Sequence, residues 1–134
     1  MTAASNKQLV RTAFESLGSS DFRPPHDLIR DDFAWILEGR SRLSRRFEGK
    51  AAVKRELLDM LFQAFATPYR FTIDEIIAEG DTVVVRGRGE VKTKAGQDYN
   101  NSYCFVLRLE DGELVELREY LDTALVERVF GSAG

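Results

Sequence analysis

Hydrophobic residues follow two different periods along this chain of 134 residues, and the period changes near Tyr69. Before Tyr69, apolar side chains recur at spacings of three and four, which is typical of amphipathic helices. After it, apolar runs with a period of two alternate with turn residues, which is typical of β-strands. The pattern therefore predicts helices in the first half and an antiparallel sheet in the second.

Three helices are expected in the first half, at about residues 6–17, 25–30 and 50–66. Ser5 and Gln8 have the spacing of a capping box at the start of the first helix. Thr67-Pro68 ends the third, because proline disfavours helical backbone in the residue before it. Between the helices, the sequence predicts a short strand at 33–37 and an exposed arginine-rich loop at 39–46.

Four long strands are expected in the second half, at 69–79, 82–93, 99–110 and 113–121, followed by a short helix at 124–130. Asp111-Gly112 is a strong hairpin signal. Strands of this length twist and must curl, and Gly87 and Gly89 fit a bend or bulge. We therefore predict one α+β domain over residues 1–134. It is a cone-shaped curled meander whose concave face is covered by three N-terminal helices around a pocket, with a short C-terminal helix.

Composition narrows the function classes. A net charge of −3 gives no electrostatic basis for binding nucleic acid, and no apolar run approaches the roughly 20 residues of a membrane span. A single cysteine, Cys104, allows no internal disulfide and favours a cytoplasmic location. His26 and Cys104 cannot make a His/Cys metal site, and nucleotide-binding glycine motifs are missing, so we expect neither metal nor cofactor. Any catalysis would then depend on carboxylates, tyrosine, arginine and asparagine.

Several segments in this order of elements resemble the nuclear-transport-factor-2-like superfamily, and more narrowly its SnoaL-like, ketosteroid-isomerase-related proteins. These segments are Trp35 in a short strand, Phe47-Glu-Gly-Lys50, Tyr99-x-Asn101-x-Tyr103 and Glu119-Tyr-Leu-Asp-Thr123. The resemblance covers nearly the whole chain and implies a deep apolar pocket and a homodimer through the outer face of the sheet. Members include isomerases, polyketide cyclases, epoxide hydrolases, dehydratases and non-catalytic binding modules, so the resemblance does not fix an activity.

Asp122 is the first candidate for the catalytic acid/base. An aspartate near the end of the last strand has this role in SnoaL-like cyclases, and Asp122 matches it by resemblance. Strand periodicity puts Tyr120 on the same face, so we expect both side chains in the pocket, with Val115, Leu117 and Leu121 facing outward toward a dimer partner. The alternative is that Asp122 or Thr123 caps the following helix.

Arg88 and Glu90 are candidate catalytic residues on a second strand. With Asp122 they resemble the Arg-x-Asp plus Asp set of limonene-epoxide-hydrolase-like members, with glutamate in place of aspartate. The alternative is an exposed charge pair on a polar face. Steroid isomerase activity is not expected, because the first helix offers Phe14 where those enzymes use tyrosine.

The remaining candidates are expected to line the pocket: Tyr103 as a polarising group, and Trp35, Asn101, Tyr120 and Phe14 as ligand contacts. The leading hypothesis is a cofactor-independent protein that binds a small hydrophobic molecule bearing a carbonyl group and transfers a proton on it. The alternatives are a non-catalytic binding or accessory dimeric module and an epoxide-hydrolase-like enzyme.

Overall fold

A computed structural model describes residues 2–15 and 28–131. Six strands form one sheet in the order β2-β1-β6-β5-β4-β3. The strands are β1 (Ile29–Leu37), β2 (Arg46–Glu48), β3 (Arg70–Glu79), β4 (Thr82–Glu90), β5 (Ser102–Glu110) and β6 (Glu113–Leu121). The helices are α1 (Ala3–Glu15), α2 (Lys50–Ala52), the π-helical turn η2 (Val53–Leu58), α3 (Asp59–Ala64) and α4 (Thr123–Phe130). β1 and β6 are parallel, and the other neighbouring pairs are antiparallel.

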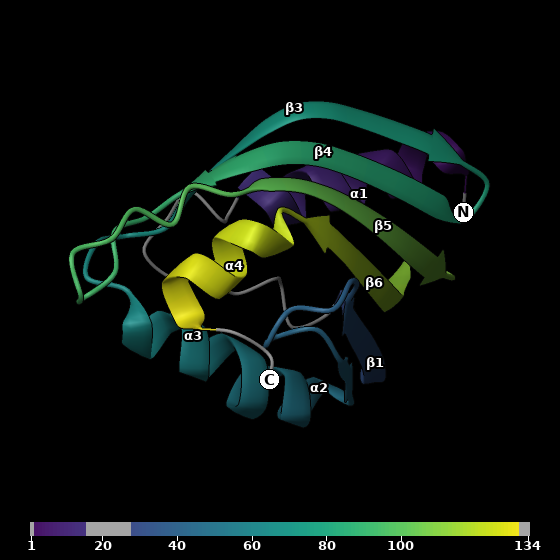
Figure 1. Cartoon of the computed structure of the whole chain (residues 1–134). Helices are drawn as coiled ribbons and strands as arrows, with labels where there is room; N and C mark the ends of the chain where they lie inside the picture. Colours follow the sequence, from purple (N-terminus) through teal and green to yellow (C-terminus); the bar gives the residue numbers. More distant parts are fainter. Residues whose placement is uncertain (1, 16–27, 132–134) are drawn as a thin grey trace.

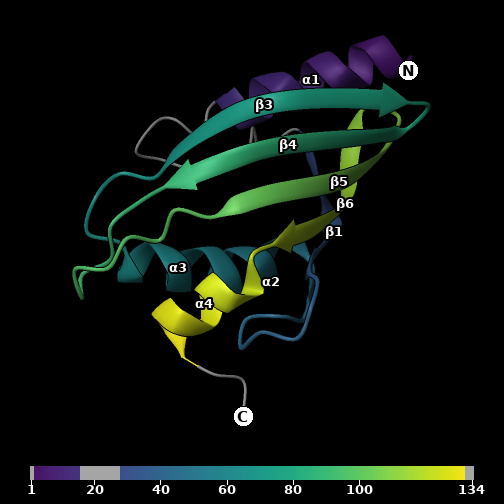
Figure 2. The same ribbon diagram turned by 45° about the horizontal axis from the view of Figure 1, so that its top comes forward.

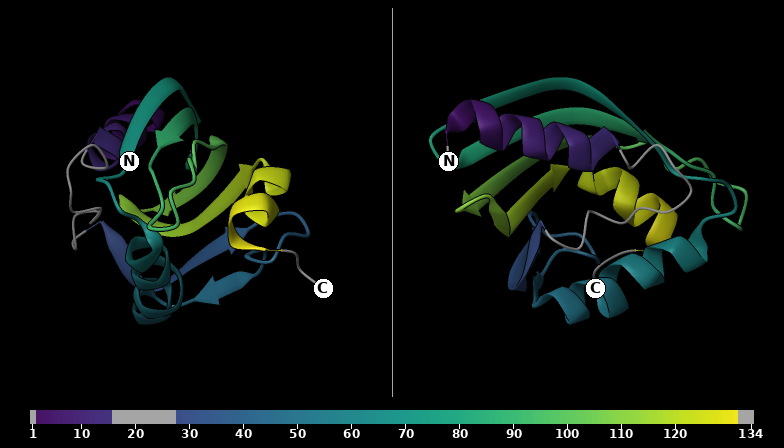
Figure 3. Two further views of the ribbon diagram at one scale, coloured as in Figure 1. Left: turned by 60° about the vertical axis from the view of Figure 1, so that its left-hand side comes forward. Right: turned by 180° about the vertical axis from the view of Figure 1, so that it is seen from behind.

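The sheet curls around its own helices. β3, β4 and β5 arch over the interior, while α2 and α3 lie across the opening on the opposite side (Figures 1 and 2). α1 runs along β3 and β4, and α4 follows the end of β6 (Figure 3). The predicted α+β cone is confirmed, and its core lies between the concave face of the sheet and these helices.

The Asp-Gly hairpin is also confirmed. Asp111 and Gly112 both have positive φ, at 50° and 78°, which matches the right-handed twist of the two strands they join. Next to this turn, the pairing of β5 with β6 shifts between Arg108 and Leu109, which leaves Val115 as an extra residue in β6. The shift changes which residues of β6 face the core.

The bounds of several expected elements differ from the structure, and three of these differences change the architecture. The short helix predicted at 25–30 is wrong where it can be compared, because Ile29 already begins β1, and residues 25–27 lie outside the described residues. Part of the predicted loop at 39–46 leads into β2, where Phe47 is buried opposite Trp35. The helix predicted at 50–66 is π-helical in its middle, over Val53–Leu58, and it ends at Ala64.

Gly87 and Gly89 make room for aromatic rings that cross β4. A Cβ atom on Gly89 would lie 2.3 Å from the Tyr69 hydroxyl oxygen, and one on Gly87 would lie 2.4 Å from the Phe71 ring. The register shift in this hairpin is in β3, between Ile73 and Glu75. Gly87 and Gly89 therefore allow close packing of aromatic rings on the concave face, and the bulge lies in the neighbouring strand β3.

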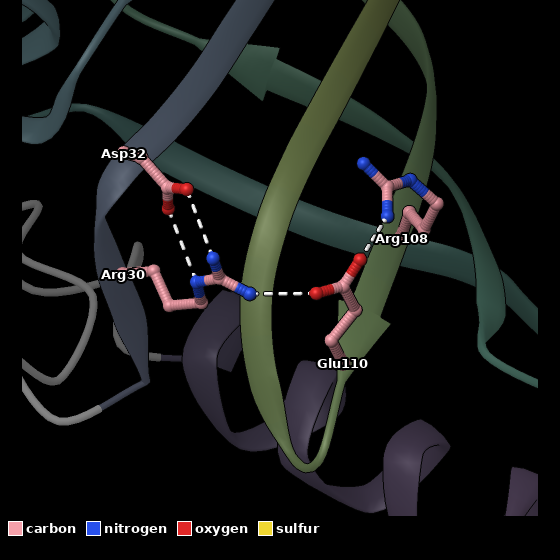
Figure 4. A network of polar contacts seen from close by, with 4 residues as sticks. All are labelled: Arg30, Asp32, Arg108 and Glu110. Atoms are coloured by element: carbon pink, nitrogen blue, oxygen red, sulfur yellow. Dashed lines mark hydrogen bonds and ion pairs between the residues drawn. The ribbon is translucent and has the colours of Figure 1, made fainter.

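A group of ion pairs joins β1 to the β5–β6 hairpin on the outside of the sheet (Figure 4). Arg30 contacts Asp32 at 2.9 Å and Glu110 at 2.6 Å, and Glu110 also contacts Arg108 at 2.7 Å. These side chains are a third or more exposed, so each pair contributes little to stability. Among the described helices, none has the length and apolar character needed to cross a bilayer.

Candidate functional site

The concave face of the sheet and the helices line a partly open cavity of about 60 Å³. Its walls are mostly aromatic and aliphatic, with one acidic side chain. The lining residues are Phe14, Trp35, Leu37, Leu43, Leu58, Leu61, Phe62, Phe65, Tyr69, Tyr99, Tyr103, Phe105 and Glu119. A space of this size holds about four water molecules, or one small organic group.

Glu119 is the acidic group of this cavity. It lies on β6 two residues after Leu117, opposite Phe105 of β5, and only 7% of the residue is exposed. Its Oε1 atom accepts a hydrogen bond from the Trp35 indole Nε1 at 3.1 Å. The second carboxyl oxygen accepts no hydrogen bond within the described part of the chain and is not sealed from the cavity space.

Burial shapes the ionisation of Glu119. Desolvation raises its pKa to about 7, and the hydrogen bond from Trp35 opposes this shift. A carboxyl group in this range is present in both its acid and base forms near neutral pH, which suits proton transfer.

Three tyrosine hydroxyl groups share the cavity with Glu119. Burial raises the pKa of Tyr99 to about 12, and it also raises the pKa values of Tyr69 and Tyr103 well above the ordinary value. The charge of Glu119 adds to each shift, so all three remain neutral hydrogen-bond donors. Phe65 stacks on Tyr69 and Phe105 on Tyr103, which fixes the orientation of those rings.

The lining of the cavity contains no lysine, arginine or histidine among the described residues. Within residues 2–15 and 28–131, no group of three or more His, Cys, Asp or Glu side chains is placed to hold a metal ion. The chemistry available at this site is therefore that of one carboxyl group, three phenols and the indole N–H.

A family model of the SnoaL-like domain matches residues 10–117. The chain belongs to the SnoaL-like domain family. A comparison with curated proteins finds no match.

Three solved structures with this SnoaL-like architecture have sequence identities below 25% to this chain, so they support the fold alone. A nuclear-transport-factor-2-like protein of unknown function from Burkholderia pseudomallei K96243 has a TM-score of 0.80 and 24% identity, covering 93% of this chain and 96% of that one. A candidate SnoaL-like polyketide cyclase from Jannaschia sp. CCS1 has a TM-score of 0.80 and 19% identity, covering 96% and 93%. TerC, co-crystallised with polyporic acid, has a TM-score of 0.79 and 21% identity, covering 96% and 99%.

Asp122 does not point into the cavity of this SnoaL-like chain. Its Oδ1 atom accepts hydrogen bonds from the backbone N–H groups of Ala124 at 3.0 Å and Leu125 at 3.3 Å, so it caps α4. The predicted orientation is wrong, and the capping alternative describes the structure.

Tyr120 is 44% exposed on the outer face of the sheet, so its predicted place beside a cavity-facing Asp122 is also wrong. Arg88 and Glu90 are exposed, and Arg88 forms an ion pair with Asp74 at 3.0 Å. Since Arg88, Glu90 and Asp122 are outside the cavity lining, the structure does not assemble the epoxide-hydrolase-like set.

The predicted outward face of β6 is wrong as well. Leu117 and Val115 are buried, and Leu121 packs against the core. The outward residues of this strand are instead Glu116, Arg118 and Tyr120, two of which form an ion pair at 3.0 Å. The apolar set faces inward because burying it stabilises the fold, and Glu119 faces inward with it.

Trp35, Phe14 and Tyr103 do line the cavity, as expected, and their roles as ligand contacts and polarising group stay predictions. Asn101 is buried beside it but is engaged with the backbone. Its amide donates to the Asp122 carbonyl at 3.1 Å and accepts from the Asp122 N–H at 2.9 Å, which joins β5 to the start of α4.

Sequence reasoning missed Glu119 and Tyr69. The signal for Glu119 was a carboxylate inside an apolar stripe of period two, Leu117-x-Glu119-x-Leu121. The signal for Tyr69 was weaker, because it depends on Gly89 leaving room for a ring from the adjacent segment.

Proposed function

We propose that this protein is a cofactor-independent acid–base enzyme that moves a proton on a small, neutral, hydrophobic carbonyl compound, with Glu119 as the group that takes and returns the proton. The observation that carries the proposal is a buried carboxyl group, with a pKa of about 7, inside an apolar cavity. Burying such a group costs free energy because burial disfavours its charged form. Groups with pKa values shifted in this way cluster at functional sites.

The ionised carboxylate of Glu119 would take a proton from the carbon next to the substrate carbonyl. The electrons of the broken C–H bond then move to the carbonyl oxygen and form an enolate. A neutral phenol, Tyr103 or Tyr69, would donate a hydrogen bond to that oxygen. The protonated Glu119 returns the proton to carbon, at the same or another position, which restores the starting enzyme and gives an exchanged or isomerised product.

Trp35 would act as a positioning residue in this scheme. Its N–H holds one carboxyl oxygen of Glu119 at 3.1 Å, which leaves the other for the substrate. Phe14 and the aliphatic residues of the helical segment would hold the apolar part of the substrate. Leu58, Leu61 and Phe62 are only partly buried, so this wall is the one best able to move for a molecule larger than about 60 Å³.

A test does not need the natural substrate. Small cyclic and aryl ketones incubated with the protein in D₂O should exchange their α-protons faster than in buffer, as followed by NMR. The rate should rise with pH through an apparent pKa near 7, because the base must be ionised. Glu119→Gln should lose the acceleration, whereas Glu113→Gln, an exposed glutamate on the same strand, should keep it. Equal rates for Glu119→Gln and wild type would refute the proposal.

A non-catalytic binding module is the second candidate. It is favoured by the small size of the cavity and by the presence of one ionisable acid without a cationic partner in its described lining. The same ketones would then bind, with shifts in the fluorescence of Trp35, the only tryptophan in the chain, but would show no proton exchange.

We further propose a cytoplasmic homodimer that pairs through the outer face of the sheet. Support comes from a row of apolar side chains that crosses three strands there, Ile77, Val84 and Val106, with Ile77 54% exposed. Light scattering at tens of micromolar should give twice the chain mass, and Ile77→Asp should shift it toward the monomer. A monomeric wild type would end this part of the proposal.

A further inference from the structure

Among residues 2–15 and 28–131, the carboxyl group of Glu119 has no positively charged partner. Its one described hydrogen bond comes from a neutral indole, and no lysine, arginine or histidine lines the cavity among the described residues. Buried carboxylates in proteins are ordinarily paired with a cation or bound to a metal. A ligand that brings its own positive charge would complete this site.

In the described part of the chain, the groups that line the cavity around Glu119 are aromatic or aliphatic. β1 contributes Trp35, β5 contributes Tyr103, and the segments before β3 and β5 contribute Tyr69 and Tyr99. These phenols are the other titratable groups of the described cavity lining, and burial keeps them neutral. Aromatic faces attract organic cations through the ring quadrupole, most strongly when water is excluded.

We infer that the cavity binds a small organic ammonium ion, with its positive charge beside Glu119 and its alkyl groups against the rings of Trp35, Tyr69 and Tyr99. A cavity of about 60 Å³ takes only a small charged head group, and the partly buried wall of Leu58, Leu61 and Phe62 would have to move for the rest of the ligand. The inference uses the cavity of the proposed function but does not depend on catalysis there.

A ligand of this class would bind better as Glu119 ionises. In the empty cavity burial disfavours the carboxylate, and the incoming cation reverses that preference. A neutral ligand of the same shape would gain the apolar contacts alone. The difference between the two ligands therefore isolates the contribution of the charge.

Choline and its neutral carbon analogue 3,3-dimethylbutan-1-ol form such a matched pair. Binding is followed by the fluorescence of Trp35 and by calorimetry at pH 5.5 and pH 8.5. At pH 8.5 choline should bind at least about tenfold more tightly than the alcohol, in the range of a desolvated cation–π and charge interaction. At pH 5.5 this advantage should shrink several-fold, because Glu119 is then protonated.

Variants locate the effect. Glu119→Gln should remove the advantage of choline at pH 8.5, whereas Glu113→Gln should keep it. The pH series on wild type answers the same question if Glu119→Gln does not fold. The inference is overturned if the two ligands bind equally, if only the alcohol binds, or if neither binds. It is also overturned if the advantage of choline is unchanged by pH or by Glu119→Gln. Choline binding without ketone exchange would leave it standing while the proposed proton transfer fails.

Discussion

Glu119 and Asp122 lie three residues apart at the end of β6, and the structure gives the two carboxyl groups opposite environments. Glu119 faces the cavity, accepts one hydrogen bond from Trp35 and is desolvated, which raises its pKa to about 7. Asp122 lies just past the strand, in water, where two backbone N–H groups of α4 hold it.

One of these carboxyl groups has a shifted pKa that suits acid–base chemistry, whereas the other stabilises the fold. A carboxylate that accepts backbone N–H groups at a helix start stabilises the fold as an anion and gains nothing from protonation. A carboxyl group in an apolar cavity destabilises its own charged form and so becomes a reactive acid or base. Both residues lie near the end of β6, so the direction and burial of each side chain decide its role.

The largest expected effect comes from replacing each carboxylate by its amide. Glu119→Gln should lower the rate of ketone α-proton exchange by about 10²–10⁴-fold, the usual contribution of a general base, because glutamine cannot accept the proton. Asp122→Asn should change that rate little, since asparagine also caps helices. NMR exchange rates in D₂O check both. If Asp122→Asn gave the larger loss, the two roles would have to be reversed.

The second largest expected effect is a difference between wild type and Glu119→Gln in how their stability depends on pH. The pKa of Glu119 is raised in the folded state, so between about pH 4.5 and 7 the unfolded chain releases a proton that the folded chain keeps. Wild type should therefore lose stability as the pH rises through this window, by up to about 3 kcal/mol relative to Glu119→Gln. Urea unfolding of both proteins at pH 4 and pH 8 measures this. Parallel pH profiles would mean that Glu119 is not desolvated.

A third expectation concerns the packing that forms the cavity wall. Gly89→Ala would place a Cβ atom 2.3 Å from the Tyr69 hydroxyl oxygen and 3.0 Å from the Tyr103 ring, so the rings must shift. The free energy of unfolding should fall by about 1–3 kcal/mol, as for other overpacked cores. In a Tyr69→Phe background the loss should be smaller, because the closest atom is gone. Urea unfolding of the four proteins gives this coupling, and additive losses would contradict it.

The smallest expected effect belongs to the helix cap. Asp122→Ala should lower the free energy of unfolding by about 1 kcal/mol, because it removes the acceptor for the Ala124 and Leu125 N–H groups. Asp122→Ser should recover most of the loss, since serine caps well. Thermal unfolding at pH 7 separates the three proteins. A loss that serine does not reduce would point to a role other than capping.

Local signals predicted most of this fold. The period change near Tyr69 located the sheet, and the Asp111-Gly112 turn set the last hairpin. The sequence pattern does not predict β2, because Phe47 is flanked by charged residues and only pairing with β1 makes that short segment a strand. It does not predict the π-helical turn either, because the apolar spacing there is that of an ordinary helix.

The site was harder to predict than the fold. Trp35, Phe14 and Tyr103 followed from their aromatic character and expected place. The family resemblance favours Asp122, and its expected inward orientation depends on assigning Val115, Leu117 and Leu121 to a dimer surface. The simpler rule that an apolar stripe faces the core puts Glu119 inside. Strand periodicity gives two faces, and a wrong choice between them exchanges every inward residue for an outward one.

The most direct measurement is the ionisation of Glu119 itself. Carboxyl ¹³C NMR of protein labelled at glutamate, with Glu119→Gln used to assign the resonance, follows that one group through the pH range. A buried carboxyl group in the cavity predicts a titration midpoint near 7, well above the ordinary value of 4.5. A midpoint near the ordinary value of 4.5 would show that Glu119 is solvated and would contradict its role as the acid/base of this cavity.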